Sequence, residues 1–423
     1  MQKPNTPFKI LVLITLLLLQ TVISSSPTTG EEKVVGDNQG RGTFAPLDQF
    51  LTDSVKKGRI VGASALVIQD KAERFYGSWG YKDADKGERI DRDTIFRIYS
   101  MTKPITSLAA MQLVEQGKMD LDDPVSDYLQ EFANLGVIES AEKSKNPRQM
   151  TIRDLLRHTS GLTYGFFDLG NPIDQLYLQR DVNASRNLAQ LVKRLSDIPL
   201  KHPPGTQFEY SVSTDVLARV IEVVSDQRFD EYLQKKILGP LDMVDTSFVV
   251  PADKRHRLAT MYSDDGNGGL TVTPAETSKN FTDDSLELFS GGGGLCSTID
   301  DYAKFAEMLV NKGQSRSGKQ IINASTLTEM FTNQLAGIDR PKKTLLNADA
   351  PWVQDDFAFG LGFSISNSQW GTDYTWNGIA GTQFWVNPEK GSIMIYMVQV
   401  FPLMGHDLAG DVKRLCYQSL SRQ

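Results

Sequence analysis

Behind an apolar N-terminal run, the first regular pattern in the chain is helical. In the stretch APLDQFLTDSVKKGRI, Leu47, Phe50, Leu51 and Val55 recur at the spacing of one helical face. Gly58 follows them and supplies a stop signal. The pattern therefore predicts a helix that ends at this glycine.

Strand patterns occur near both ends of the chain. GASALVIQDKAERFYGSWGYKD is rich in β-branched and aromatic residues on both sides of Asp70 and Lys71, which predicts two strands joined there. Far downstream, FAFGLGFSIS predicts a strand, and TQFWVNPEKGSIMIYMVQV predicts a hairpin that turns between Asn387 and Gly391. A helix over about 403–420 follows.

The region between these strands is mostly helical. After Ser100, apolar residues recur at three- and four-residue steps (Ile105, Leu108, Ala109 and Leu113), and Gly117 ends the run. TIRDLLRHTSGL predicts a further short helix, because its Thr-x-x-Asp start is a relative of the capping box. STDVLARVIEVVSDQRFDEYLQKKIL predicts two amphipathic helices, and TIDDYAKFAEMLVNKG predicts one more.

This order of elements predicts an α+β fold. Strands at both ends of a chain pair most simply in one antiparallel sheet, and the terminal helices then cover it. The mostly helical middle becomes an inserted lobe. We therefore expect one domain over 44–420, in which 44–99 and 290–420 form an α/β lobe and 100–289 form the helical lobe.

The N-terminus has the three-part layout of a secretory signal peptide. Two lysines without an acid precede an apolar run from Ile10 to Leu19, and small polar residues follow. We expect a signal peptide over 1–26, cleavage near Ser24 to Ser26, and a flexible tail over 27–43. The run is shorter than the roughly 20 residues that span a bilayer. The prediction is a secreted or periplasmic protein without a stable membrane anchor after cleavage; the alternative is a retained N-terminal anchor.

Composition excludes several classes of function. The formal net charge is −7, and no basic stripe is present, which argues against nucleic acid as a partner. Cys296 and Cys416 do not make a disulfide scaffold, and we expect two buried free thiols, although export permits one bridge. The chain has four histidines and no His-x-x-x-His or Cys-x-x-Cys pair, so neither a metal site nor a cofactor is expected.

The stretch YSMTKP carries the first candidate chemistry. Ser100 and Lys103 lie three residues apart, so on a helix they share one face and the amine can reach the hydroxyl. Pro104 is tolerated in a first helical turn, which suggests that the helix begins at or just before Ser100. Free N–H groups at that start favour an oxyanion near the serine. A serine needs a base, and lysine serves when burial or a nearby cation disfavours its charged form.

Two further stretches carry possible site residues. Tyr210 lies between a Pro-Gly turn and a helix that contains Asp215, where its phenol can be aimed into a cleft. In YTWNGIAGTQFW, Gly378 and Gly381 interrupt a strand pattern, which marks a bulge or a close backbone approach. Each feature alone also fits an ordinary packed tyrosine or a kinked strand.

The three motifs in this order resemble those of the serine β-lactamase and penicillin-binding-protein superfamily, which has a Ser-x-x-Lys signature. The likeness is greatest to its class C branch and, within it, to the β-lactamase-like (family VIII) carboxylesterases. The stretches LDDPVSDYL, PLDMVDTSF, GGGGLCST and FGLGFSI stand in the order of the family. The resemblance covers roughly 44–420 and implies the β-lactamase/transpeptidase-like fold.

The resemblance implies roles for three residues. Ser100 is similar to the acylated nucleophile of the family, and Lys103 to its general base. Tyr210 is similar to the second acid/base group, which shares the proton with the lysine and passes it to the leaving group.

The third motif of the family falls on Trp376-Asn377-Gly378. The resemblance places the oxyanion hole at the backbone N–H groups of Ser100 and Ile379. Trp376, Asn377 and Gly378 are expected to contact a bound substrate.

Two departures from the class C pattern shift the expected substrate. Trp376 stands where those β-lactamases have lysine, as in the esterase branch, and Val212 stands where Tyr-x-Asn would place asparagine. A cation and an amide that would hold a β-lactam or peptide are therefore missing, whereas ester acylation needs neither. Tyr164, Phe166 and Phe167, together with Trp376, would form an aromatic mouth for an acyl or aryl ester, although each also fits core packing.

The remaining motifs carry less. His158 lies in RHTSGL and is expected to be structural, and no motif surrounds His202, His256 or His406. The absence of a Gly-x-Ser-x-Gly elbow argues against an α/β-hydrolase triad. SGGGGLCST is expected to be a tight backbone segment near the cleft.

The sequence therefore predicts an exported serine hydrolase that acts on a small-molecule ester through an acyl-Ser100 intermediate. The first alternative keeps this site for a β-lactam, a D-amino peptide or another amide. An alternative of another class is a non-catalytic binding protein with the same fold.

Overall fold

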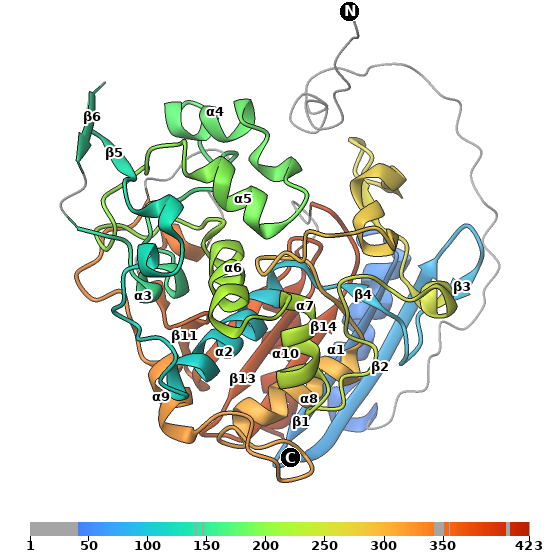
Figure 1. Ribbon diagram of the computed structural model, residues 1–423. Coiled ribbons are helices and arrows are strands. Elements are labelled where there is room, and N and C mark those ends of the chain that lie inside the picture. The colour runs from blue at the N-terminus through green and yellow to red at the C-terminus, as the bar shows by residue number, and fades with distance from the viewer. Residues whose placement is uncertain are drawn as a thin grey trace, which may run out of the picture. The chain divides into compact units, whose positions relative to one another are not determined.

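An eight-stranded antiparallel sheet joins the N-terminal and C-terminal strands of the chain (Figure 1). The computed structural model describes residues 41–139, 142–145, 148–341, 351–354, 356–402 and 407–422. In spatial order, the sheet consists of β10 (Ala358–Phe359), β11 (Ser364–Ser368), β12 (Gly371–Asn377), β13 (Gln383–Asn387), β14 (Ser392–Met397), β1 (Gly62–Gln69), β2 (Ala72–Asp83) and β3 (Glu88–Arg89).

The pairing of β1 with β14 closes the sheet across the whole chain. The register sets Leu66 opposite Ile395. Side chains alternate between the two faces, as the period of two in a strand requires. Ala65 and Val67 face one apolar cluster, whereas Leu66 and Ile68 face the other. Each face of the sheet therefore has its own core, and the predicted antiparallel sheet is confirmed.

Helices cover both faces of this sheet. The helices of the described residues are α1 (Arg41–Lys56), α2 (Thr102–Glu115), α3 (Ile152–Leu156), α4 (Pro172–Gln179), α5 (Leu188–Leu195), α6 (Ser213–Ser225), α7 (Phe229–Leu233), α8 (Ile299–Val310), α9 (Ala324–Phe331) and α10 (Ala409–Leu420). The terminal helices α1 and α10 pack together on one face, and α8 packs on β13 and β14 from the other. The α+β class, with its mostly helical insertion, is confirmed.

Shorter turns connect these elements. The 3₁₀ turns are η1 (Tyr99–Met101), η2 (Val125–Asp127), η3 (Gln130–Phe132), η4 (Val182–Ala184), η6 (Ala252–Arg257), η7 (Ala275–Thr277), η8 (Lys279–Thr282) and η9 (Pro351–Val353), and η5 (Gln234–Leu238) is a π-helical turn that extends α7. Small two-stranded sheets are formed by β4 (Phe96–Arg97) with β9 (Cys296–Ser297), β5 (Gly136–Glu139) with β6 (Glu142–Lys145), and β7 (Tyr262–Asp264) with β8 (Leu270–Val272).

Several sequence predictions need correction at this level. Two hairpins, β5–β6 and β7–β8, interrupt the region predicted to be helices and loops. The predicted tail over 27–43 ends too late, since α1 already begins at Arg41. The fully buried ring of Phe44 stacks on Phe75 with centroids 4.9 Å apart, which fixes this first turn. The C-terminal helix begins only at Ala409, whose N–H is accepted by the Asp407 side chain.

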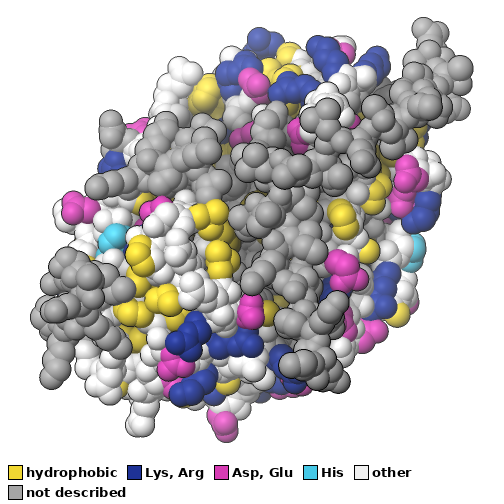
Figure 2. All heavy atoms as spheres, turned by 90° about the horizontal axis from the view of Figure 1, so that it is seen from above, with side chains coloured by type: hydrophobic (Ala, Val, Ile, Leu, Met, Phe, Trp, Pro, Cys, Tyr) yellow, Lys and Arg dark blue, Asp and Glu magenta, His cyan; other side chains and the backbone are white. Residues whose placement is uncertain are grey.

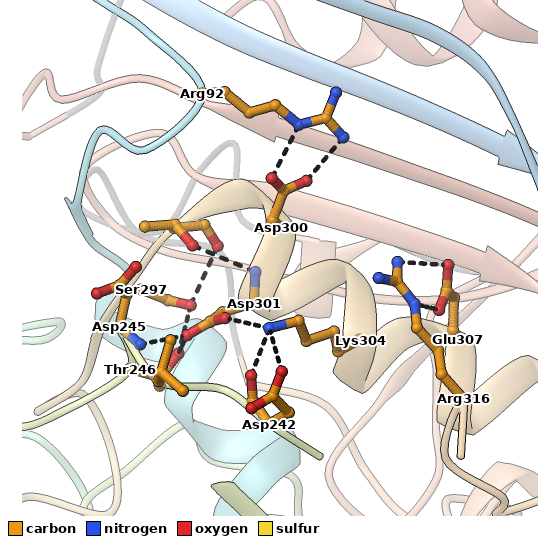
Figure 3. A network of polar contacts seen from close by, with 12 residues as sticks. Arg92, Asp242, Asp245, Thr246, Ser297, Asp300, Asp301, Lys304, Glu307 and Arg316 are labelled. Atoms are coloured by element: carbon orange, nitrogen blue, oxygen red, sulfur yellow. Dashed lines mark hydrogen bonds and ion pairs between the residues drawn. The ribbon is translucent and has the colours of Figure 1, made fainter. Parts of the chain in front are cut away.

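A buried polar network fixes the start of α8 (Figure 3). Asp301, in the first turn of α8, accepts hydrogen bonds from the Asp245 backbone N–H at 2.7 Å and the Thr246 hydroxyl at 3.1 Å. Lys304, one turn later, pairs with the same carboxylate at 3.0 Å. Thr246 also contacts the Ser297 hydroxyl at 2.8 Å. The network therefore anchors β9, which pairs with β4 just ahead of Ser100.

The surface carries charges of both signs. On the face seen in Figure 2, basic and acidic side chains are interspersed, and small groups of apolar side chains lie between them. The described side chains of this face form no continuous basic stripe.

Both cysteines are free and buried, as predicted. Burial raises the pKa of each thiol, Cys296 and Cys416, to about 12. The predicted signal peptide and the rest of the tail, as well as His406, lie outside the described residues. Within the described residues, no helix has both the length and the apolar character needed to cross a bilayer.

Candidate active site

Ser100 lies in the strained turn η1, between β4 and α2. Tyr99 has a φ of +41°, a conformation that is uncommon outside glycine and that persists where surrounding contacts enforce it. The Met101 N–H donates to the Ile98 carbonyl at 3.0 Å, and the Tyr302 hydroxyl donates to the Met101 carbonyl at 3.0 Å. These contacts hold the turn, and the Ser100 side chain remains partly exposed.

Lys103 reaches Ser100 from the first turn of α2, as the three-residue spacing predicts. Its amine lies 3.2 Å from the Ser100 oxygen. The same amine lies 2.9 Å from the Tyr164 hydroxyl and 2.6 Å from the Gly292 carbonyl oxygen. The residue is only 1% exposed, and the hydrogen-bond partners of its amine among the described residues are two hydroxyls and a carbonyl. The three groups in direct contact with the amine are thus polar and uncharged.

Tyr210 approaches the serine from the other side. Its hydroxyl donates to the Ser100 oxygen at 2.8 Å, and its ring centroid lies 4.6 Å from the Lys103 amine. The Trp376 indole N–H donates to the Tyr210 oxygen at 3.4 Å. Residues from three stretches that are far apart in the sequence are therefore brought together at this hydroxyl.

The glycine-rich segment before β9 contacts Lys103 through the Gly292 carbonyl. The sequence reasoning assigned no role in the site to Gly292 or to its partner Asp215. Asp215, in the first turn of α6, accepts the Gly292 N–H at 3.0 Å and the Ser290 hydroxyl at 2.5 Å. A Cβ on Gly291 would lie 2.6 Å from the Thr214 carbonyl oxygen, and one on Gly292 would lie 2.4 Å from Asp215. Only glycine fits here, which explains the tight segment expected near the cleft.

The third motif ends β12 and begins the turn to β13. A Cβ on Gly378 would lie 2.4 Å from the Ile98 carbonyl oxygen, so the turn passes directly against the residues that precede the nucleophile. The Thr382 hydroxyl also donates to this carbonyl, at 3.3 Å. The side chain of Ile379 is 39% exposed, and that of Asn377 is partly exposed. The glycines thus mark a turn at the end of a strand rather than a bulge within it.

Aromatic rings pack around the ring of Tyr210. Ring centroids lie 5.2 Å from it for Tyr164, 6.1 Å for Phe167 and 5.3 Å for Trp376. Phe166 stacks on Tyr164 at 5.3 Å. All of the predicted aromatic residues therefore belong to one cluster.

Trp352 is a member of this cluster that the sequence reasoning missed. Its ring lies 4.6 Å from that of Tyr210 and 6.2 Å from that of Trp376. The signal was a tryptophan in PWVQDD, a short stretch without helical or strand periodicity. Such a residue is found only through its tertiary contacts.

Burial changes the titration of two groups beside the amine. The pKa of the Tyr164 phenol is raised well above its usual value by burial, with Tyr210 and Asp215 adding to the effect. The pKa of His158 is lowered well below its usual value, first by burial and then by Lys103. His158 packs its neutral ring 5.0 Å from that of Tyr210 and contacts the Ser211 hydroxyl at 3.3 Å. These contacts agree with the structural role expected for it.

Val212 is buried at the start of α6, so the position of the family's asparagine presents an apolar side chain. His202 and His256 lie away from this group: His202 contacts Glu209 and Gln207, and His256 lies in η6.

Comparison with known proteins identifies the family to which the chain belongs. The family model described as Beta-lactamase matches residues 47–416. The chain belongs to the beta-lactamase family. Protein Rv1367c of Mycobacterium tuberculosis is 33% identical over 374 residues, which are 84% of this chain and 90% of that protein. Esterase EstB of Burkholderia gladioli is 33% identical over 226 residues, 52% of this chain and 55% of the esterase.

Solved structures of other proteins have the same fold. EstCE1, described as a hydrolase with promiscuous acyltransferase activity, superposes with a TM-score of 0.71 at 23% identity, over 89% of this chain and 98% of its own. Simvastatin synthase (LovD) of Aspergillus terreus superposes with a TM-score of 0.73 at 21% identity, over 89% and 98%. The family-model match over residues 47–416 confirms the superfamily recognised from the sequence.

Proposed function

We propose that the protein is an exported serine hydrolase that cleaves small-molecule esters through an acyl-Ser100 intermediate. The observation that carries this proposal is the position of the Ser100 oxygen, 3.2 Å from the Lys103 amine and 2.8 Å from the Tyr210 hydroxyl. A nucleophile within hydrogen-bond reach of both a base and a second proton carrier has the geometry of covalent acyl transfer.

Acylation follows from these distances. The Ser100 oxygen attacks the ester carbonyl while its proton passes to the Lys103 amine. When the tetrahedral intermediate collapses, Tyr210 gives its proton to the leaving alcohol and is reprotonated from Lys103. One ester and one serine hydroxyl thus become one acyl-serine and one alcohol.

Deacylation reverses the proton transfers. Water takes the place of the leaving alcohol and passes a proton through Tyr210 to Lys103 as it attacks the acyl carbonyl. Ser100 leaves with that proton, and the acid is released. The Trp376 N–H, 3.4 Å from the Tyr210 oxygen, would stabilise negative charge on that oxygen during both steps.

The oxyanion would bind to the backbone N–H groups of Ser100 and Ile379. The contact between Gly378 and the Ile98 carbonyl supports this assignment, because it keeps the turn that carries Ile379 beside the strand that leads to Ser100. Preorganised donors of this kind are each worth on the order of 10²–10³ in kcat.

Two side chains favour an ester over a β-lactam or an amide. Trp376 is 2% exposed and uncharged where a lysine would hold a carboxylate, and Val212 offers no amide. The similarity to Esterase EstB supports the same choice. EstCE1 is described as having promiscuous acyltransferase activity, so an added alcohol is included in the test as a possible acyl acceptor in place of water.

The decisive experiment uses the purified mature protein beside Ser100→Ala. Both are incubated with a short-chain p-nitrophenyl ester, with and without added alcohol, and with a chromogenic cephalosporin. Both are also treated with a fluorophosphonate that labels active serines. Ester turnover and labelling that disappear in Ser100→Ala are the expected result.

Other outcomes point to the alternatives. Cephalosporin turnover without ester turnover would establish a β-lactamase. An unlabelled and inactive wild type would support the non-catalytic binding protein. For export, N-terminal sequencing of the protein recovered from periplasm or medium should find a start between residues 24 and 28; a start at Met1 would overturn that part.

A further inference from the structure

The hydroxyl of Tyr164 contacts the base of the proposed reaction. It lies 2.9 Å from the Lys103 amine, closer than the Ser100 oxygen at 3.2 Å. Phe166 and Phe167, which follow shortly after it, pack as aromatic rings in the same cluster and have no polar side-chain atom. A phenol at this position therefore does something that a ring alone would not.

The hydrogen-bonding capacity of the Lys103 amine indicates the role of the Tyr164 hydroxyl. A lysine amine that acts as a base has two N–H donors and one lone pair. The Gly292 carbonyl oxygen, at 2.6 Å, can only accept, so it takes one N–H. If the Tyr164 oxygen accepts the second, the lone pair is left for the third neighbour, the Ser100 hydroxyl. If Tyr164 instead gave its proton to the amine, the lone pair that Ser100 needs would be occupied.

The loop that carries Tyr164 is fixed to the loop that carries Tyr210. Thr163 donates to Asp174 at 2.5 Å, Asp174 pairs with Lys201 at 3.0 Å, and Lys201 pairs with Glu209 at 2.9 Å. All three ionic side chains are at most 7% exposed. Tyr164 follows Thr163 directly and Tyr210 follows Glu209 directly, so this buried ion-pair cluster sets the distance between the two phenols.

We propose that Tyr164 is a positioning residue for the general base: its hydroxyl accepts one N–H of Lys103 and thereby directs the amine's lone pair to Ser100. This inference rests on the proposed function of Ser100 and Lys103. It assigns to Tyr164 a role in the chemical step, in addition to its place in the aromatic cluster.

The test compares Tyr164→Phe with wild type, with Ser100→Ala and with a matched control. Tyr128→Phe removes a hydroxyl that donates to Asp123 at 2.5 Å, outside the site. For each protein, kcat and KM are measured with a p-nitrophenyl ester, the rate of fluorophosphonate labelling is followed, and thermal unfolding is recorded.

We expect Tyr164→Phe to lower kcat and the labelling rate by about tenfold to a hundredfold, the scale of a misplaced catalytic group, with KM within twofold of wild type. Tyr128→Phe should keep the wild-type kcat. If Tyr164→Phe folds and keeps kcat within twofold of wild type, or changes only KM, then Tyr164 contributes only its ring to the aromatic cluster. The inference is then overturned.

A failure of the proposed function looks different. In that case wild type and Ser100→Ala turn the ester over equally, or neither does, whatever the state of residue 164. If Tyr164→Phe folds poorly, the labelling rate of its folded fraction is compared with that of wild type in place of kcat. A labelling rate within twofold of wild type would again overturn the inference.

Discussion

The Gly292 carbonyl oxygen lies 2.6 Å from the Lys103 amine, although 189 residues separate the two in sequence. The direction of this carbonyl is set from the other side of the same residue, because the Gly292 N–H donates to the Asp215 carboxylate at 3.0 Å. One helix, α6, therefore fixes the peptide that holds the amine of another helix, α2.

Replacing Asp215 with alanine should disturb the site without touching its reactive atoms. Asp215→Ala leaves the Gly292 N–H and the Ser290 hydroxyl without their acceptor, and a buried unsatisfied donor costs about 1–3 kcal/mol. We expect a loss of stability on this scale in urea unfolding and a fall in kcat of about tenfold or more, since the Gly292 carbonyl loses its fixed direction. Asp215→Asn keeps an acceptor and should lie between; a fully active alanine variant would contradict the role.

Adding one methyl group at Gly378 should move the third motif away from Ser100. In Gly378→Ala the new Cβ would lie 2.4 Å from both the Ile98 carbonyl oxygen and the Thr382 hydroxyl. Overpacking of this kind costs about 1–3 kcal/mol. We expect lower stability and a large loss of ester turnover. The control is Gly410→Ala in α10, where no atom of the described residues lies within 4 Å of the new Cβ; it should keep its activity and gain about 0.5–1 kcal/mol.

Trp376→Phe separates the indole N–H from the ring. The variant keeps an aromatic side chain beside Tyr210 and removes the donor at 3.4 Å from the Tyr210 oxygen. The bond is long, so we expect a loss of only about threefold to tenfold in kcat, equivalent to about 0.5–1.5 kcal/mol. Trp376→Leu should lose more of kcat, because it also removes one aromatic ring from the cluster. Equal losses in the two variants would show that only the ring matters.

His158 should make the protein less stable in acid. Its pKa is lowered well below the usual value of a histidine, so the unfolded chain binds a proton that the folded protein does not. Stability is therefore complete above about pH 6.5 and falls as the pH decreases below that value, by up to about 2 kcal/mol at pH 5.

The measurement is the difference between unfolding free energies at pH 7.5 and pH 5.0. His158 has a φ of +57°, a conformation that asparagine tolerates, so His158→Asn keeps the backbone. The variant should be less stable at pH 7.5 and yet lose less on acidification than wild type. An unchanged pH difference would show that another group carries the effect.

The sequence predicts those parts of the fold and the site that depend on local pattern. The Lys103 amine reaches the Ser100 oxygen across three residues, and the Thr151–Asp154 capping box forms as expected. The β13–β14 hairpin turns where Asn387 to Gly391 predicted it. Tyr210 was placed by its motif, and its hydroxyl reaches Ser100.

What the sequence could not supply are contacts set by the tertiary path of the chain. The Tyr164 hydroxyl meets Lys103 across 61 residues, and no local pattern distinguishes that hydroxyl from the neighbouring rings. Asp215 looks like an ordinary acid in the first turn of α6 until Gly292 is seen to pack on it. The polar hairpin β5–β6 lacks the alternation of apolar residues that marks a half-buried strand.

The two buried cysteines give the protein an experimental advantage. The sequence contains two, each has its thiol pKa raised to about 12, and neither is accessible in the folded state. Since the thiolate is the reactive form, maleimides and disulfide reagents should leave the native protein unmodified. A single cysteine introduced at an exposed position such as Val244, which is 64% exposed, would therefore accept a fluorophore or a surface linkage in a defined orientation. The protein can be immobilised or tracked through one chosen atom without first removing a native thiol.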